Sequence, residues 1–158
     1  PVTAGERILE IGCGLALAGL VGHRRGADVT ASDCHPLAGA FLRENLRLND
    51  LPPMKYRHGQ WGVPADADAA DQVQGQFDLV MGSDLLYERD EDGALARFIA
   101  RHAAPAAQVW IIDPDRGNRP AFTRSMAAQG FGVREERLHT PASAGVPAYK
   151  GRVLVYAR

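Results

Sequence analysis

The stretch RILEIGCGLALAGL, residues 7–20, decides the fold. Its first part, RILEIG (7–12), is a short apolar run typical of a buried strand, and Gly12 and Gly14 then mark a tight turn. The following segment, 15–25, has helical periodicity and ends in basic residues before a glycine, which is typical of a helix C-terminus. A strand, a glycine turn and a helix in this order are typical of a nucleotide-binding loop.

The turn departs from the dinucleotide pattern G-x-G-x-x-G, because Leu17 stands where the third glycine lets helix and strand pack closely. Glu10, near the end of the strand, is costly to bury without a partner and would repel a diphosphate. It suits a ligand with ammonium or hydroxyl donors. We therefore expect a nucleoside with a cationic amino-acid tail, approached by the backbone at Gly12, Cys13 and Gly14, and we disfavour a nicotinamide dehydrogenase.

The rest of the chain alternates short apolar runs with helical periods, which is typical of an α/β domain with an open, doubly wound parallel sheet. Expected strands are 7–12, 28–33, 54–61, 77–84 and 108–114, followed by an antiparallel pair, 132–140 and 152–158, with a short connection. Expected helices are 15–25, 36–50, 90–102 and 120–130. Residues 62–76 are polar and small, and we interpret them as a loop or short exposed helix.

Two of these helices carry a predicted apolar face. In 36–50 it consists of Leu37, Phe41, Leu42, Leu46 and Leu48. In 120–130 the inward residues are Phe122 and Met126. The acidic run 88–93 is interpreted as a charge cluster at a helix start, where the helix dipole favours it.

Ligands of such sheets bind beyond the carboxyl ends of the strands. Asp33 ends the second strand, roughly 20 residues after the glycine turn, and its carboxylate can accept hydrogen bonds from two ribose hydroxyls. The alternative is that Asp33 caps the helix that Pro36 begins. Other chain segments at strand ends are 34–35, 60–61, 83–84 and 113–114.

Composition limits the function further. The 158 residues, 46% of them hydrophobic, suit one domain over 1–158, and a net charge of −1 gives no general field for nucleic acid or an anionic membrane. Cys13 and Cys34 are too few for a disulfide framework, so we expect a reducing, cytoplasmic location. Five scattered histidines predict no metal site. Because Pro1 is not an initiator methionine, we expect the full gene product to have a further N-terminal segment.

The sequence resembles a known family. LEIGCGLA (9–16) followed by ASD (31–33) resembles the first two motifs of class I, seven-β-strand S-adenosylmethionine-dependent methyltransferases, with Ala16 in place of the last motif glycine. SDLLYE (83–88) is similar to the D-x-x-Y motif of the protein-lysine methyltransferases, methyltransferase family 16. That family and its bacterial nicotinamide N-methyltransferase-like relatives also have motifs similar to the segments 44–50, 59–62 and 113–116.

The resemblance implies a Rossmann-like sheet of strand order 3-2-1-4-5-7-6 with the last strand antiparallel. It also implies S-adenosylmethionine as cofactor and S-adenosylhomocysteine as product. Two groups of residues are then expected to form the site. The cofactor-binding group is Glu10, Gly12, Cys13, Gly14, Asp33, Cys34, His35, Trp61 and Ser83, with Cys34 and His35 flanking the adenine and Trp61 stacking on it. Asp84 and Tyr87 are the catalytic group near the transferable methyl.

The function implied first is N-methylation of a protein lysine, in which Asp84 orients the amine and Tyr87 shapes an aromatic wall. The alternatives are a small-molecule N-methyltransferase and a non-catalytic cofactor-binding or interaction module. The partner is accordingly a protein or small-molecule acceptor, with neither nucleic acid nor membrane expected.

Single residues also have alternative interpretations. The alternative for Asp84 is that it caps a turn, and for Tyr87 that it only packs. For Cys13 and Cys34 the alternative is an oxidation switch. Arg116, Arg119 and Arg124 recognise an acidic substrate group or form a solvated face. Nothing in the sequence indicates an oligomeric state.

Overall fold

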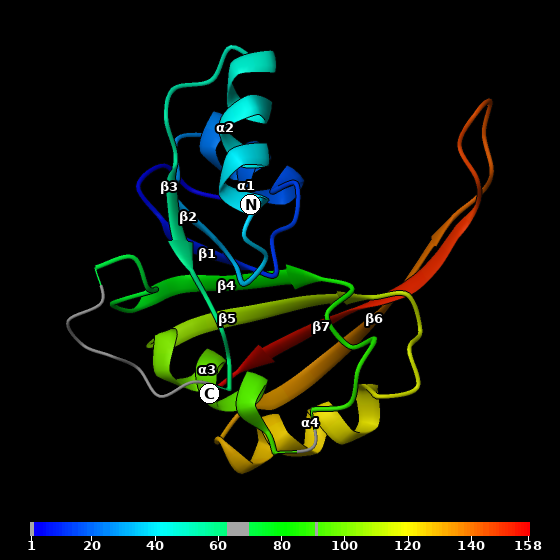
Figure 1. Ribbon diagram of the computed structural model, residues 1–158. Coiled ribbons are helices and arrows are strands. Elements are labelled where there is room, and N and C mark those ends of the chain that lie inside the picture. Colours follow the sequence, from blue (N-terminus) through cyan, green and yellow to red (C-terminus); the bar gives the residue numbers. More distant parts are fainter. Residues whose placement is uncertain (1, 63–69, 91) are drawn as a thin grey trace.

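The computed structural model, which describes residues 2–62, 70–90 and 92–158, has one sheet in the order β3-β2-β1-β4-β5-β7-β6 (Figure 1). The strands are β1 (Arg7–Ile11), β2 (Asp28–Asp33), β3 (Lys55–His58), β4 (Phe77–Ser83), β5 (Ala103–Asp113), β6 (Gly132–Thr140) and β7 (Tyr149–Ala157). β7 pairs antiparallel with β5 and with β6, whereas the other pairs are parallel. The expected strand order and antiparallel last strand are confirmed.

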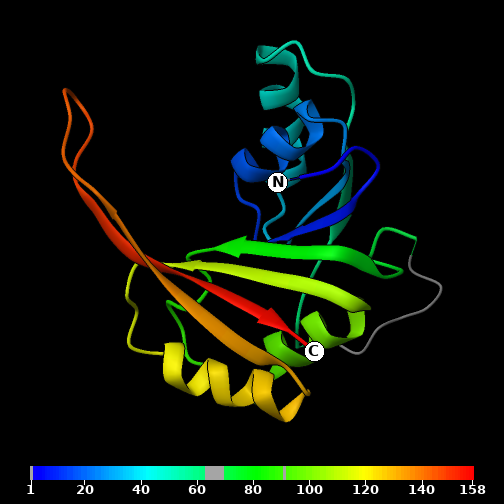
Figure 2. The same cartoon turned by 180° about the vertical axis from the view of Figure 1, so that it is seen from behind.

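The helices cover both faces of the sheet (Figures 1 and 2). α1 (Leu17–Arg24) and α2 (Ala38–Leu48) lie on one face, and α3 (Ala94–His102) and α4 (Arg119–Ala128) lie on the other. Strand alternation divides the core accordingly: Ile8 packs with Val29 on the first face, and Leu9 packs in the cluster that contains Phe122 and Met126 of α4. The prediction that Phe122 and Met126 point inward is confirmed, since both are buried.

The predicted apolar face of α2 is wrong in part. Leu42 and Leu46 are buried, but Leu37, Phe41 and Leu48 are 50% to 63% exposed. The helix approaches the sheet closely through small residues in its first turn, where a Cβ on Gly39 would lie 3.0 Å from the ring of Tyr56. Because the helix packs over the edge strand β3, it buries the side chains spaced i, i+4 at Leu42 and Leu46. The other apolar side chains of the predicted face remain exposed.

Several element ends differ from the predictions. β5 begins at Ala103 instead of 108, and β7 begins at Tyr149 instead of 152, so that these two strands are longer than expected, whereas β6 has its predicted bounds. α3 begins at Ala94 because the Asp90 carboxylate accepts hydrogen bonds from the backbone N–H groups of Leu95 and Ala96. Of the expected loop 62–76, residues 63–69 lie outside the described residues. No helix in the described part of the chain is long and apolar enough to cross a membrane.

Parallel register brings the functional strand ends together. Glu10 of β1 is level with Ala31 of β2 on one side and with Met81 of β4 on the other. The turns that follow these three strands therefore meet at one edge of the sheet, which is where open α/β sheets bind ligands.

Candidate functional site

A cavity of about 370 Å3 lies at this edge, within the size range of small-molecule sites. Among the predicted site residues, those that line it are Gly12, Asp33, Cys34, Trp61, Ser83, Asp84 and Tyr87. The cavity has further lining residues that were not predicted as site residues, although all but Ala94 lie in the motifs 59–62 and 83–88: Gly59, Gln60, Gly62, Leu85, Glu88 and Ala94. The predicted residues Glu10, Cys13, Gly14 and His35 do not line it.

The turn after β1 has an unusual backbone. Gly12, Gly14 and Ala16 have φ values of +56°, +51° and +57°, in the left-handed region that favours glycine. Gly12 is also required for space, because a Cβ there would lie 2.4 Å from a methyl group of Leu85. Ala16 adopts this conformation despite its Cβ, which costs about 1 kcal/mol. Its conformation therefore explains why a glycine is expected at this motif position.

Asp33 joins two turns of the cavity wall. The Gly14 N–H donates to its Oδ2 and the His35 N–H to its Oδ1, both at 2.8 Å. It does not cap α2, because the N-cap of that helix is Leu37 and no side chain caps it. Each carboxylate oxygen has further acceptor capacity, so that hydroxyl donors from a ligand can still bind.

Glu10 is buried beneath the turn and its Oε2 accepts a hydrogen bond of 2.8 Å from the Gly19 N–H. Burial raises the pKa of Glu10 to about 7, against the lowering effect of the hydrogen bonds from the backbone of Gly19 and Ala18. The carboxylate thus holds the first turn of α1, where helix N–H groups lack intrahelical partners. Its contact with a cofactor stays a prediction.

Two other predicted residues lie beside the cavity without lining it. Burial raises the pKa of the Cys13 thiol to about 12, so the thiolate chemistry that an oxidation switch needs is disfavoured. His35 is exposed, and its Nδ1 accepts the Leu37 N–H at 3.2 Å. His35 thus orders the chain before α2, and its position beside an adenine stays a prediction.

Asp84 follows β4 in a left-handed conformation, with φ of +53°, and its N–H donates to the Ile112 carbonyl. The Arg116 guanidinium donates to both Asp84 carboxylate oxygens, at 2.9 and 2.8 Å. This bidentate pair holds the pKa of Asp84 below its usual range. The Arg116 N–H donates to Asp113 Oδ2 at 2.8 Å, so the loop after β5 fixes the position of the pair.

The Arg116 side chain is therefore 45% exposed but paired with Asp84, which leaves it less available to an acidic group of a substrate. Arg119 is also paired, with Asp115 and Glu135. The sequence signal for Arg116 was its place just beyond the end of β5, which neighbours β4 in the sheet.

The turn 84–87 buries its two leucines and exposes its tyrosine. Leu85 fills the space over Gly12 and Gly82, and the Leu86 carbonyl accepts a hydrogen bond from the Asn118 side chain at 2.9 Å. These contacts leave Tyr87 61% exposed at the mouth of the cavity.

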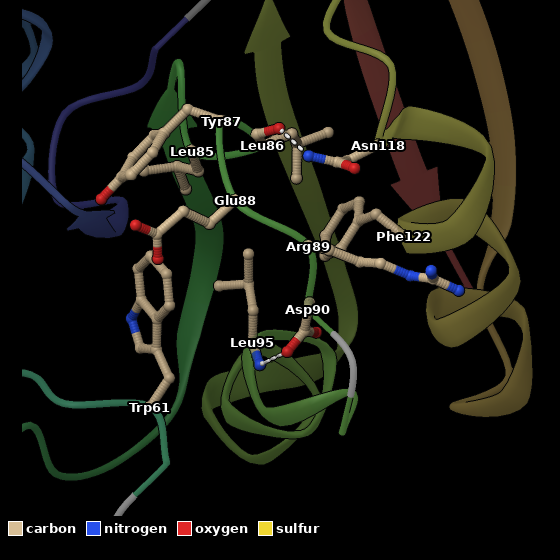
Figure 3. A pocket seen from close by; sticks show the side chains of 10 residues that line it. All are labelled: Trp61, Leu85, Leu86, Tyr87, Glu88, Arg89, Asp90, Leu95, Asn118 and Phe122. Atoms are coloured by element: carbon tan, nitrogen blue, oxygen red, sulfur yellow. Dashed lines mark hydrogen bonds between the residues drawn. The ribbon is translucent and has the colours of Figure 1, made fainter.

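Tyr87, Glu88 and Trp61 point toward one another in Figure 3, between the main cavity and an adjoining pocket of about 110 Å3. Glu88 therefore faces the site, whereas within the acidic run that was interpreted as a helix start it is Asp90 that bonds to the first turn of α3. Two aromatic rings and two carboxylates, those of Asp84 and Glu88, form this part of the wall.

Comparisons with known proteins agree with this geometry. A family model described as lysine methyltransferase matches residues 2–122. Protein N-lysine methyltransferase METTL21A from Mus musculus is 33% identical over 153 residues, which are 94% of this chain and 66% of that protein. EEF1A lysine methyltransferase 3 from Mus musculus is 25% identical and is covered over 54% of its length by 80% of this chain. The chain thus spans between about half and two thirds of these relatives.

Solved structures give the same fold. A methyltransferase from Pyrococcus furiosus superposes with a TM-score of 0.76 at 18% identity, over 99% of this chain and 77% of that one. A ribosomal protein L11 methylase from Lactobacillus delbrueckii subsp. bulgaricus gives a TM-score of 0.68 at 20% identity, over 97% of this chain and 70% of that one.

Proposed function

Since the chain belongs to this lysine methyltransferase family, we propose that it transfers a methyl group from S-adenosylmethionine to the side-chain amine of a protein lysine. One observation carries the proposal. A single cavity has Gly12 and Asp33 in one part of its wall. In another part it has Asp84 and Tyr87, with Trp61 and Glu88 beside them. The first part suits a nucleoside and the second suits an amine.

The residues present fit the cofactor. Asp33 offers acceptor capacity to ribose hydroxyls, and Gly12, which has no side chain, lets Leu85 pack against the turn and lines the cavity with backbone. Trp61 and Cys34 line the same cavity and offer surface to the adenine. When bound, S-adenosylmethionine supplies a methyl group already activated on a positively charged sulfur.

Asp84 acts on the acceptor by charge and position. Its carboxylate, held anionic by Arg116, attracts the lysine ammonium and orients the amine for in-line attack. Because its pKa is lowered, it is a poor place to store a proton at neutral pH, so the proton leaves the lysine to water. Tyr87 and Trp61 contact the aliphatic part of the lysine and limit water at the reacting atoms.

The exposure of Tyr87 and the position of Glu88 at the mouth favour a protein side chain over a small molecule, since a small aromatic amine needs an enclosed site. Some related proteins act on other acceptors. Human METTL23, which is 30% identical over 110 residues covering 67% of this chain and 56% of that protein, is described as a histone-arginine methyltransferase. The identity of the modified side chain is therefore the point to test.

The chain is incubated with methyl-labelled S-adenosylmethionine and a protein extract, and the label is located by mass spectrometry. We expect label on lysine Nζ, and its loss in Asp84→Asn with S-adenosylhomocysteine binding retained. Asp78→Asn, which breaks an exposed ion pair with Arg7 at the start of β4, is the matched control and keeps activity. Label on arginine or only on small molecules, or full activity of Asp84→Asn, would contradict the proposal.

A further inference from the structure

The end of β6 and the start of β7 form an arm, residues 137–152, that projects beyond the rest of the sheet (Figures 1 and 2). Pairing of β7 with β5 ends at Asp113 and Arg152, whereas pairing of β6 with β7 continues to Thr140 and Tyr149. The outer part of the arm is therefore a two-stranded ribbon without a third strand beside it. Ribbons of this kind are marginal on their own, so its length needs a reason.

One face of the arm is basic. Arg137 lies directly opposite Arg152, and His139 lies opposite Lys150. Directly opposite residues share a face, as do residues two apart in one strand, so that all four side chains lie on the same face. The sequence from 137 to 158 contains neither aspartate nor glutamate. Like charges placed opposite each other destabilise a strand pair, so the arrangement works against the stability of the arm.

The two ends of this basic face differ. At the root, Arg152 pairs with Asp115 at 2.7 Å and with Glu135 at 3.3 Å. Farther out, Arg137 and Lys150 have no ion-pair partner among the described residues. Their charges are available to an acidic partner outside the chain.

The root of the arm lies next to the acceptor part of the site. Asp115, which binds Arg152, precedes Arg116, the residue that clamps Asp84. Tyr149, on the other face of the arm from Lys150 and Arg152, lies over Gly151, with its Oη 2.7 Å from where a Cβ on that glycine would be. Partial burial raises the pKa of Tyr149, and the charges of Asp113, Asp84 and Asp115 raise it further, so that its hydroxyl lies in the field of the site's carboxylates.

We propose that the basic face of the arm, Arg137, His139 and Lys150, binds an acidic segment of the protein whose lysine enters the site. The proposal rests on the proposed function. The acidic wall at Asp84 and Glu88 attracts the lysine, and the cationic arm beside it attracts carboxylates that flank that lysine in the acceptor. The acceptor class is thus a protein with a lysine near an acidic stretch.

The test measures binding by fluorescence anisotropy at low salt, without any methyl transfer. The probes are a labelled peptide with one lysine between runs of glutamate, the same peptide with glutamine in place of glutamate, and a single-stranded uridine oligonucleotide. The variant is Arg137→Glu with Lys150→Glu. The control with the same charge change is Arg25→Glu with Arg43→Glu, two exposed arginines of the β1–β3 half of the molecule.

We expect the glutamate peptide to bind about tenfold or more tightly than the glutamine peptide. The arm variant loses this preference, the control variant retains it, and both keep the thermal shift caused by S-adenosylhomocysteine, which shows that they fold. Equal affinity for the two peptides, or a preference unchanged in the arm variant, overturns the inference. Binding of the oligonucleotide but not of the peptide overturns it in favour of a nucleic-acid surface.

The binding data, taken together with the methyl-transfer assay described for the proposed function, separate this inference from that function. Arm-dependent peptide binding in a protein that shows no methyl transfer would contradict the function and retain the binding surface. Methyl transfer to lysine that ignores flanking acids would retain the function and remove the surface.

Discussion

The two parts of the cavity are built in different ways. The cofactor part, after β1 and β2, is shaped mainly by backbone groups: a left-handed glycine turn, and two N–H groups, those of Gly14 and His35, that donate to Asp33. The acceptor part, after β4, depends on side chains that are distant in sequence, above all the pair of Asp84 with Arg116, 32 residues apart. We therefore expect substitutions in the cofactor part to change stability and cofactor binding, and substitutions in the acceptor part to change the KM for the acceptor.

The largest expected effect is a loss of stability caused by a substitution in the cofactor part. Gly12→Ala should destabilise the fold by about 3 kcal/mol, because the new Cβ adds a clash with Leu85 to an unfavourable φ. Gly14→Ala is the matched control: its φ is similarly positive, but no atom lies within 4 Å of the new Cβ, and its cost should be about 1 kcal/mol. Urea unfolding measures both. Equal losses would mean that space above Leu85 does not matter.

Glu10 makes the stability of the first part dependent on pH. Its pKa rises from 4.5 to about 7 on folding, which corresponds to about 3 kcal/mol. A raised carboxyl pKa means that the folded state binds the proton more tightly, so stability is highest below about pH 4.5 and falls as the pH rises to about 7. Glu10→Gln keeps an acceptor for Gly19 and should lack this loss.

The measurement for Glu10 is the free energy of unfolding of both proteins at pH 5 and pH 8. We expect the free energy of unfolding of Glu10→Gln, relative to that of the wild-type protein, to be higher at pH 8 than at pH 5. A wild-type protein and variant that change in parallel would show that Glu10 is not the group responsible.

Arg116→Ala tests whether the acceptor part can be changed without an effect on the cofactor part. Without its partner the Asp84 carboxylate is no longer aimed, and KM for the acceptor should rise about tenfold with S-adenosylhomocysteine affinity unchanged. The stability change should be under about 1 kcal/mol, because the pair is exposed by nearly half. Arg116→Lys should recover part of the effect. Steady-state kinetics decide this, and a loss of cofactor binding in Arg116→Ala would contradict the division between the two parts.

The smallest expected effect is at Ala16. Ala16→Gly relieves a left-handed alanine but increases the freedom of the unfolded chain, so the net gain in stability should be about 0.5 kcal/mol. Thermal unfolding shows whether the variant is more or less stable than the wild-type protein. A destabilised variant would show that contacts of the buried alanine methyl outweigh the backbone strain.

Local features of the chain were predictable from the sequence. β2 was predicted with its observed bounds, because a run of strand-forming residues ends at an acid, and the glycine turn was predicted from its spacing. The strand order required the family resemblance, since periodicity does not show which strands are neighbours.

Features that depend on tertiary contacts were not predictable from pattern. The cost of burying Glu10 was foreseen, but its partner is the backbone of α1, which residue types do not reveal. The pairing of Arg116 with Asp84 and the place of Glu88 in the cavity wall were not predicted, because both depend on loops that fold back over β4. On α2, which leucines are buried depends on how closely the helix approaches Tyr56.

The most direct test of the central claim, that the cavity beside Asp33 is a site for the methyl donor, is the thermal shift caused by S-adenosylhomocysteine. At 100 times its dissociation constant the ligand should stabilise the wild-type protein by about 2.7 kcal/mol, with NAD giving no shift. Asp33→Asn should lose most of the shift. Asp28→Asn, at the other end of the same strand, should keep it. No shift in the wild-type protein, or an equal shift in Asp33→Asn, would contradict the account.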